Sequence, residues 1–341
     1  MAGRAGDGAT LKKRFRLFLI FLFSVHGFSI DAGAASQPRS DQTNGDNDYS
    51  RPGLFTFIQK APGDLVDVAH ETFRKENTGA FVWMAVGTGV LIVMDQTLVD
   101  KAHRLGTRLG ISHTGYQKTF ARVRVPPTSK DLNFEGPFDS GSALYFLGDG
   151  WTDVVMIGGF MGYGLVQSDN RALQTSSQIA ESILTSGAVV QTLKHVTGRE
   201  SPFTTDTPRG NWRFFPNQYE YARHVPSYDA FPSGHLAAMM AAVTVIANNY
   251  PEYTYVRPVG YSLMTVLSFQ MLNNGVHWAS DYPLGIWLGY AFGKMAVRKG
   301  RTPRTMTAEN IWEFSPMVLN AGIGLEARFH FSGKPKPEED D

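Results

Sequence analysis

Six apolar segments, each 13 to 19 residues long, limit the possible folds of this chain more than any other feature of the sequence. They lie at 81–94, 154–166, 178–196, 235–250, 259–272 and 284–297. Strands are usually shorter than this, whereas helices commonly reach these lengths. The pattern predicts an all-α helical bundle, and 43% hydrophobic residues are enough to fill its core.

The N-terminus has the pattern of an export signal. A basic stretch at 12–16 precedes an apolar run at 17–30, and small residues follow at 32–36. The apolar run is shorter than the ~20 residues that span a bilayer, which favours cleavage after Ala34 over an uncleaved anchor helix. We therefore expect a signal peptide at 1–34 and an exported protein, periplasmic or associated with a membrane of the cell envelope.

The segments that flank the bundle differ from it in composition. Residues 35–75 are expected to form a polar linker, because their first half is rich in turn formers. Apolar and polar residues alternate over 317–331, which predicts a short β-strand or hairpin in 301–333 that packs on the bundle. The charged end at 334–341 is expected to be disordered.

Composition narrows the possible partners and chemistry. Lys plus Arg is 32 and Asp plus Glu is 31, so no charge excess indicates a nucleic-acid partner. Cysteine is absent, which excludes disulfides and thiolate catalysis. None of the six segments is an unbroken apolar run of about 20 residues, yet their small residues also suit helix packing in lipid. The soluble, peripheral and integral alternatives stay open.

Three clusters contain residues suited to phosphate chemistry. Lys194 and Arg199 stand at the end of an apolar helix, where cations also stabilise the helix dipole. In the second cluster, Pro-Ser-Gly-His, Ser233 predicts a helix N-cap and Gly234 allows close approach of an oxyanion to the backbone. A plain N-cap accounts for Ser233 but leaves His235 unexplained.

The third cluster is a histidine and a carboxylate four residues apart, His277 and Asp281. At this spacing the carboxylate can accept the proton of one imidazole nitrogen, which leaves the other nitrogen nucleophilic. A structural His-Asp pair is the alternative interpretation.

The order of these clusters resembles the type 2 phosphatidic acid phosphatase (PAP2) superfamily, which shares its helical core with class A bacterial acid phosphatases and vanadium haloperoxidases. The resemblance covers roughly residues 76–300. It implies that His277 attacks phosphorus to form a phosphohistidine, that Asp281 orients it and that His235 protonates the leaving alcohol. It also implies that Lys194, Ser233 and the amide of Gly234 hold the phosphoryl oxygens, with no metal or other cofactor.

Two arginines of the family pattern are missing. Ser201 stands where the first motif has the arginine before its proline, and Gln270 and Met271 stand where the third motif has Ser-Arg. Charge-assisted contacts to phosphate are strong, so we expect another arginine to compensate. Arg199 is our choice for this substrate-binding role, and the alternatives, in the segment before the central motif, are Arg209, Arg213 and Arg223.

The resemblance favours a metal-independent phosphatase acting on phosphomonoesters, with lipid phosphates and isoprenyl pyrophosphates among the candidate substrates. A vanadate-dependent haloperoxidase, a phosphotransferase and a non-catalytic envelope protein that retains the fold are the alternatives. The sequence does not decide the leaving group or the oligomeric state.

Overall fold

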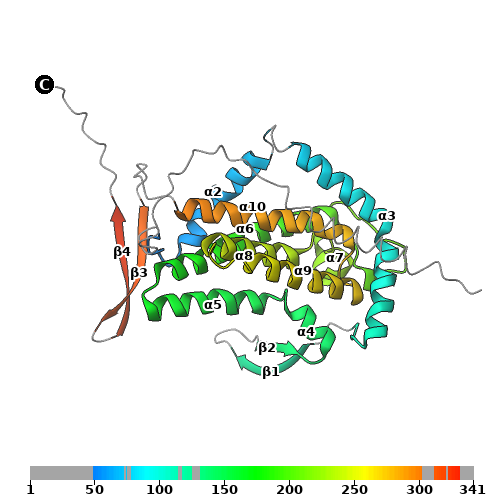
Figure 1. Cartoon of the computed structure of the whole chain (residues 1–341), viewed down its shortest axis with the longest axis horizontal. Coiled ribbons are helices and arrows are strands. Elements are labelled where there is room, and N and C mark those ends of the chain that lie inside the picture. Colours follow the sequence, from blue (N-terminus) through cyan, green and yellow to red (C-terminus); the bar gives the residue numbers. More distant parts are fainter. Residues whose placement is uncertain are drawn as a thin grey trace, which may run out of the picture.

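The computed structural model describes residues 49–72, 74, 78–113, 117–124, 131–301, 311–319 and 322–330. The expected signal peptide at 1–34 and the expected disordered tail at 334–341 lie outside these residues. The described part is mostly helical, which confirms the all-α prediction (Figure 1). Its helices are α2 (Thr56–Thr72), α3 (Thr78–Leu109), α4 (Ser140–Phe146), α5 (Gly150–Gln167), α6 (Asn170–Thr197), α7 (Gln218–Arg223), α8 (Gly234–Asn249), α9 (Val256–Asn273) and α10 (Tyr282–Arg301).

Helix α8 lies at the centre of the bundle and packs against α6, α9 and α10 (Figure 1). Most of its residues are buried, because alanine, valine and methionine occupy nearly all of its faces. Helix α5 covers α6, and α3 packs against α9. The apolar segments of the sequence therefore assemble around α8.

Three glycines at four-residue spacing bring α10 against α8. A Cβ atom at Gly285, Gly289 or Gly293 would lie 2.4, 2.1 or 3.0 Å from the carbonyl oxygen of Ser233, Ala237 or Ala241, respectively. The distances at Gly285 and Gly289 are shorter than Cβ contacts allow, and the distance at Gly293 is tighter than most of them, so the close approach of the two backbones depends on glycines without a side chain. This contact fixes the start of α10 beside the first residues of α8.

Replacing Gly285 with alanine should therefore lower the free energy of unfolding by about 1–3 kcal/mol, because a methyl group would displace the Ser233 carbonyl. Gly187 in α6 is a matched control, since a Cβ there meets nothing within 4 Å. Gly187→Ala should be neutral or stabilising by up to about 1 kcal/mol. Urea unfolding of both variants measures the difference, and equal stability of the two would contradict the close-packing argument.

Helix α2 occupies much of the segment that we expected to be a polar linker. It packs against α6 and α10, buries Val68, and pairs its buried Asp64 with Lys299 of α10 at 2.7 Å. The sequence gives little helix signal here because Pro62 and Gly63, both turn formers, lie inside the helix. The structure thus extends the helical part of the chain toward the N-terminus.

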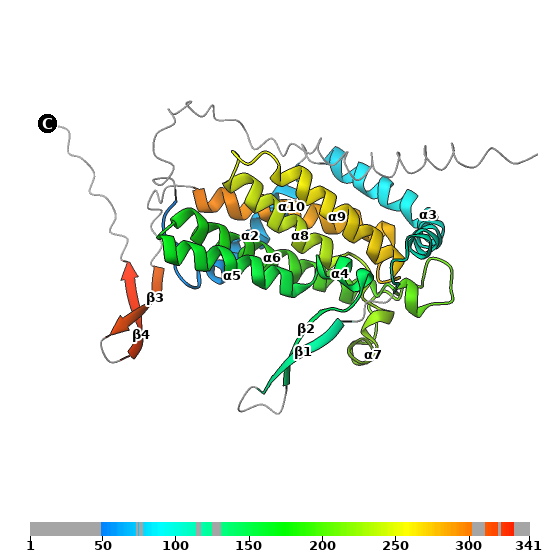
Figure 2. The same ribbon diagram turned by 60° about the horizontal axis from the view of Figure 1, so that its bottom comes forward.

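Two antiparallel hairpins accompany the helices. The pair β3 (Ile311–Leu319) and β4 (Gly322–His330) confirms the predicted C-terminal hairpin. The pair β1 (Gln117–Arg124) and β2 (Asp131–Pro137) was not predicted, and it projects from the bundle next to α4 (Figure 2). Its strands contain several charged residues and a glycine, so the sequence gives little strand signal there.

Helix α3 is the one helix in the described residues that is long and apolar enough to cross a membrane, over Phe81–Leu109. In the structure the apolar segment 81–94 is part of this longer helix. The argument that the segment is too short to span a bilayer therefore does not apply to α3. Only 22% of its most apolar stretch is buried inside the protein. By length and composition alone, the helix is a weak indication of contact with a membrane.

Candidate active site

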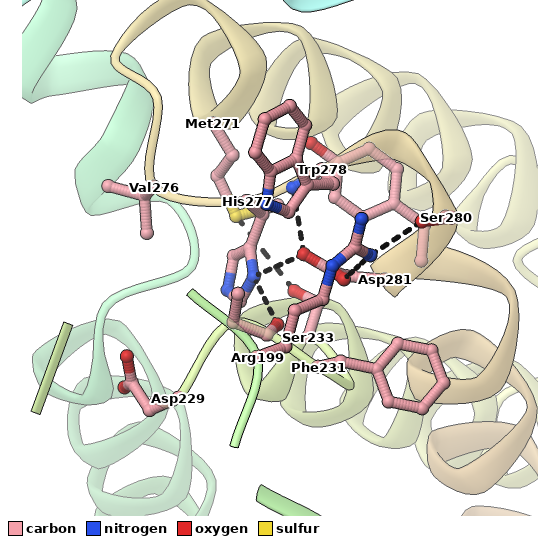
Figure 3. Close-up of polar contacts among 12 residues, drawn as sticks. Arg199, Asp229, Phe231, Ser233, Met271, Val276, His277, Trp278, Ser280 and Asp281 are labelled. Atoms are coloured by element: carbon pink, nitrogen blue, oxygen red, sulfur yellow. Dashed lines mark hydrogen bonds and ion pairs between the residues drawn. The ribbon is translucent and has the colours of Figure 1, made fainter. Parts of the chain in front are cut away.

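Residues of the three clusters of the sequence lie together, as Figure 3 shows for Arg199, Ser233, His277 and Asp281. Helix α6 ends just before Gly198, whose φ of 52° turns the chain so that Lys194 and Arg199 come to the same region. The first turn of α8 presents Ser233, and the connection from α9 to α10 brings His277. Segments far apart in the sequence therefore form a single site.

The hydrogen bonds of His277 define its protonation. Its Nδ1 lies 2.8 Å from the carbonyl oxygen of Ala230 and 3.3 Å from Oδ2 of Asp281. Both partners are acceptors, so Nδ1 carries the proton and donates it. The Nε2 atom is buried and has no hydrogen-bond partner among the described residues. His277, with 2% exposure, thus has an unprotonated, unoccupied Nε2.

Burial also sets the pKa values of this pair. It lowers the pKa of His277 to about 3, and the positive charge of Lys194 acts in the same direction. Burial raises the pKa of Asp281 to about 6, opposed by the Arg199 guanidinium and by the Trp278 N–H, which donates to Oδ2 at 2.7 Å. At neutral pH the imidazole is therefore neutral and Asp281 is ionised.

Arg199 is fully buried and bonded to carboxylates on two sides. Its Nη1 contacts Oδ1 of Asp281 at 2.5 Å, and its Nη2 contacts Oδ2 of Asp95 in α3 at 2.6 Å. Ser280 joins the same network: its hydroxyl accepts from Arg199 and donates to Asp95, each at 2.6 Å. We expected Arg199 to hold a phosphoryl oxygen. In the free protein both of its terminal nitrogens are engaged by Asp281, Ser280 and Asp95, while its Nε has no hydrogen-bond partner among the described residues.

The first turn of α8 is tied directly to the His277 segment. Ser233 caps the helix, with its Oγ accepting from the N–H of Leu236 at 3.5 Å, and its own N–H donates to the carbonyl of Asp281 at 2.9 Å. Gly234 follows as the first helical residue. The N–H groups of Ser233 and Leu236 are thus already bonded, and the remaining N–H groups of the first turn, such as that of Gly234, lack intrahelical partners and suit an anion.

His235 faces His277 across the site, with ring centroids 5.6 Å apart. Its Nε2 lies 2.8 Å from the hydroxyl oxygen of Tyr145 in α4. Burial lowers the pKa of His235 to about 3, and repulsion by Lys194 and by a protonated His277 acts in the same direction. Without an anionic ligand, both histidines are neutral.

Lys194 is a cation near the two histidines whose ion pair with a carboxylate is longer than those of Arg199. It is 9% exposed, and its Nζ lies 3.4 Å from Oδ2 of Asp229, a longer separation than either ion pair of Arg199. The positive charge of Lys194 lowers the pKa of both His235 and His277. A bound phosphate would compete with Asp229 for this ammonium.

The carbonyl of Arg209 accepts from Nη2 of Arg199 at 3.4 Å, but the side-chain contacts described for the other candidate arginines lie outside this cluster. Arg209 is exposed and has a positive φ of 71°. Arg213 contacts Glu200 at 3.4 Å and the carbonyl of Ser227 at 3.1 Å, and Arg223 lies over the ring of Tyr219. None of the contacts described for these three arginines reaches His235 or His277.

Gln270 and Met271, which replace the Ser-Arg of the family pattern, are both buried. The Sδ of Met271 lies 4.0 Å from the hydroxyl oxygen of Ser233 (Figure 3). A thioether thus stands beside Ser233, where the family pattern suggests a guanidinium. Gln270 instead bonds to the carbonyl of Ser112 at 3.0 Å.

Sequence reasoning missed three residues that the structure brings to the site, Asp95, Tyr145 and Asp229. Asp95 interrupts an apolar helix with a buried charge, which is a recognisable sign of a paired carboxylate. Asp229 stands four residues before Ser233, close to the Pro-Ser-Gly-His cluster. Tyr145 has no local signal, because only the packing of α4 on α9 places it near His235.

Comparison with protein families finds a match to part of the chain. Residues 177–303 match the family model of the PAP2 superfamily. This segment is similar to that superfamily. The matched PAP2 segment includes Lys194, His235, His277 and Asp281, whereas Asp95 and Tyr145 lie outside it.

Searches of curated proteins and of solved structures find no match to the chain. The match to the PAP2 model supports a phosphatase-type function in general, and the PAP2 family acts on phosphate esters.

Proposed function

We propose that the protein is a metal-independent phosphoric ester hydrolase in which Nε2 of His277 attacks phosphorus. The observation that supports this most directly is the state of the imidazole: Nδ1 is held by Ala230 and Asp281, and the buried Nε2 has no partner. A buried nitrogen with a free lone pair is poised for an incoming electrophile. A purely structural histidine would normally use both nitrogens.

The surrounding groups fit the charge that develops in such a reaction. The amide of Gly234, the Ser233 hydroxyl and Lys194 hold the phosphoryl oxygens, and the N-terminal end of α8 adds its dipole. His235, on the opposite side of the site, supplies the proton for the leaving oxygen. A phosphate dianion raises the pKa of both histidines from their values in the free protein, which allows His235 to be protonated when substrate is bound.

Arg199 has an indirect role in this mechanism. It holds Asp281 in position through Nη1, while its Nη2 contacts Asp95, whose pKa is raised by burial. The negative charge of Asp281 stabilises the cationic imidazole that forms when His277 bonds to phosphorus. Phosphate binding then depends on Lys194 and the backbone of α8 rather than on arginines.

A substrate panel tests the proposal. Purified protein in the presence of a chelator should hydrolyse at least one class among phosphomonoesters, lipid phosphates and isoprenyl pyrophosphates. The absence of the two family arginines is what favours the non-catalytic alternative, and inactivity toward the whole panel would establish it. Halide oxidation after loading with vanadate would instead support the haloperoxidase alternative, which we do not expect with a single lysine as the binding cation.

The proposal also predicts the acid limb of the pH profile. As the pH falls through about 6, Asp281 takes up a proton and loses the charge that stabilises the His277 cation, so kcat/KM should decline. His277 itself does not set this limb, because burial keeps its pKa near 3. In Asp281→Asn the limb near pH 6 should disappear and the remaining activity should be low. If the limb persists unchanged in that variant, the substrate's own ionisation causes it.

A further inference from the structure

Tyr145 makes the closest polar contact of His235. Its hydroxyl oxygen lies 2.8 Å from Nε2, and the two rings have centroids 5.0 Å apart with their planes tilted by 52°. Tyr145 comes from α4, outside the segment that matches the PAP2 model. The contact therefore joins a residue from another part of the chain to the proposed general acid.

The position of Tyr145 is fixed by its surroundings. Helix α4 starts with a capping box in which Asp139 accepts from the Ser142 N–H at 2.7 Å. At the other end, a Cβ at Gly148 would lie 2.5 Å from Leu267 and 3.2 Å from Cβ of His235, so the turn after α4 lies directly against His235. The hydroxyl is thus held at His235 by packing at both ends of a short helix.

This contact limits how a proton can leave Nε2 of His235. An imidazole nitrogen has one N–H or one lone pair, directed along one line, and at Nε2 that line is occupied by Tyr145. A hydroxyl has one proton to donate and lone pairs to accept, so it can receive from Nε2 and donate elsewhere at the same time. Burial and the charges of Asp149 and Asp229 raise the pKa of Tyr145 well above its usual value, which keeps the hydroxyl protonated.

We propose that Tyr145 is a catalytic residue that relays the proton between His235 and the leaving oxygen. As His277 Nε2 bonds to phosphorus and the bond from phosphorus to the leaving oxygen breaks, the Tyr145 hydroxyl gives its proton to that oxygen and receives one from Nε2 of the His235 imidazolium. The products are the free alcohol, neutral Tyr145, neutral His235 and phosphohistidine. In the second half-reaction a water gives its proton to Tyr145 and Tyr145 gives one to His235, while the water oxygen displaces His277 from phosphorus.

This inference rests on the proposed function, and it predicts a dependence on the leaving group. Tyr145→Phe should lower kcat/KM about 100-fold for an alkyl phosphate, whose leaving oxygen needs a proton, and less than about threefold for 2,4-dinitrophenyl phosphate, which does not. Tyr261→Phe is the matched control, because Tyr261 packs against the same core cluster as Tyr145. The control should change neither rate by more than about twofold.

Two further measurements separate a relay from a packing role. Adding Tyr145→Phe to His235→Ala should cause no further loss, since the two residues act in series. Rates in mixtures of H2O and D2O should follow a two-proton curve for the alkyl substrate. A straight line, or an equal loss for both substrates in Tyr145→Phe, would overturn the relay.

The same assays distinguish failure of the relay from failure of the proposed function. If His277→Ala is inactive but Tyr145→Phe affects all substrates equally, the hydrolase proposal stands and the relay is wrong. If His277→Ala retains full activity, the hydrolase mechanism is wrong, and the relay, which delivers a proton within that mechanism, is wrong with it.

Discussion

Replacing His277 with alanine is expected to reduce turnover by about 10⁴-fold or more, the largest effect of any single substitution in this site. The reason is that alanine removes the atom that bonds to phosphorus, and no other described side chain presents a comparable unpartnered nitrogen next to Lys194 and the start of α8. Steady-state kinetics on the best substrate of the panel measures the loss.

Stability must be measured on the same variant. His277 packs among buried residues, so its removal is expected to cost about 1–3 kcal/mol, from its hydrogen bonds and the space that it leaves. His277→Gln is a second variant that retains much of the volume, and it should be folded and equally inactive. A folded His277→Gln protein with normal turnover would contradict the nucleophile assignment.

Replacing Arg199 with alanine is expected to have the largest effect on stability. It leaves two buried carboxylates, Asp95 and Asp281, without the guanidinium between them. Removing one partner from a buried ionic network costs about 3–5 kcal/mol. Urea unfolding should show this loss, whereas Arg213→Ala, at a side chain that is 42% exposed, should stay within about 1 kcal/mol of the unmodified protein.

The kinetics of a milder variant separate the two roles considered for Arg199. Arg199→Lys keeps the charge but cannot bond both carboxylates with the geometry of a guanidinium. If Arg199 positions Asp281, this variant should have a lower kcat and a KM within about twofold of the unmodified protein. A large rise in KM with normal stability would instead support direct phosphate binding.

The sequence predicted those parts of the site whose chemistry is local. Ser233 and Gly234 predict a helix start, because serine is a preferred N-cap residue. The four-residue spacing of His277 and Asp281 predicts that the two side chains can make contact. The alternation of residues near the C-terminus likewise predicted the hairpin that β3 and β4 form. In each case the partners lie within a few residues of each other or follow a short repeat.

The interactions that the sequence did not predict join distant positions. Asp95 bonds to Arg199 across 104 positions, and Tyr145 bonds to His235 across 90. Helix or strand periodicity contains no information about such pairs, because they depend on how α3 and α4 pack against the bundle. The same reason explains why we expected Arg199 to bind phosphate. The local sequence shows a cation near Lys194, but it does not show that Asp95 of α3 lies beside that cation.

The central claim is that His277 becomes phosphorylated, and trapping the intermediate tests it most directly. His235→Ala protein is mixed with 2,4-dinitrophenyl phosphate, quenched in alkali and digested for mass spectrometry. Alkali preserves phosphohistidine, whereas it hydrolyses acyl phosphates. Because His235→Ala slows the attack of water as well as the protonation of poor leaving groups, the intermediate should accumulate. Our account predicts a phosphoryl group on the peptide that contains His277, and its absence in the His235→Ala, His277→Gln double variant. Phosphate on any other residue, or turnover of this substrate with no phosphorylated peptide, would contradict the account.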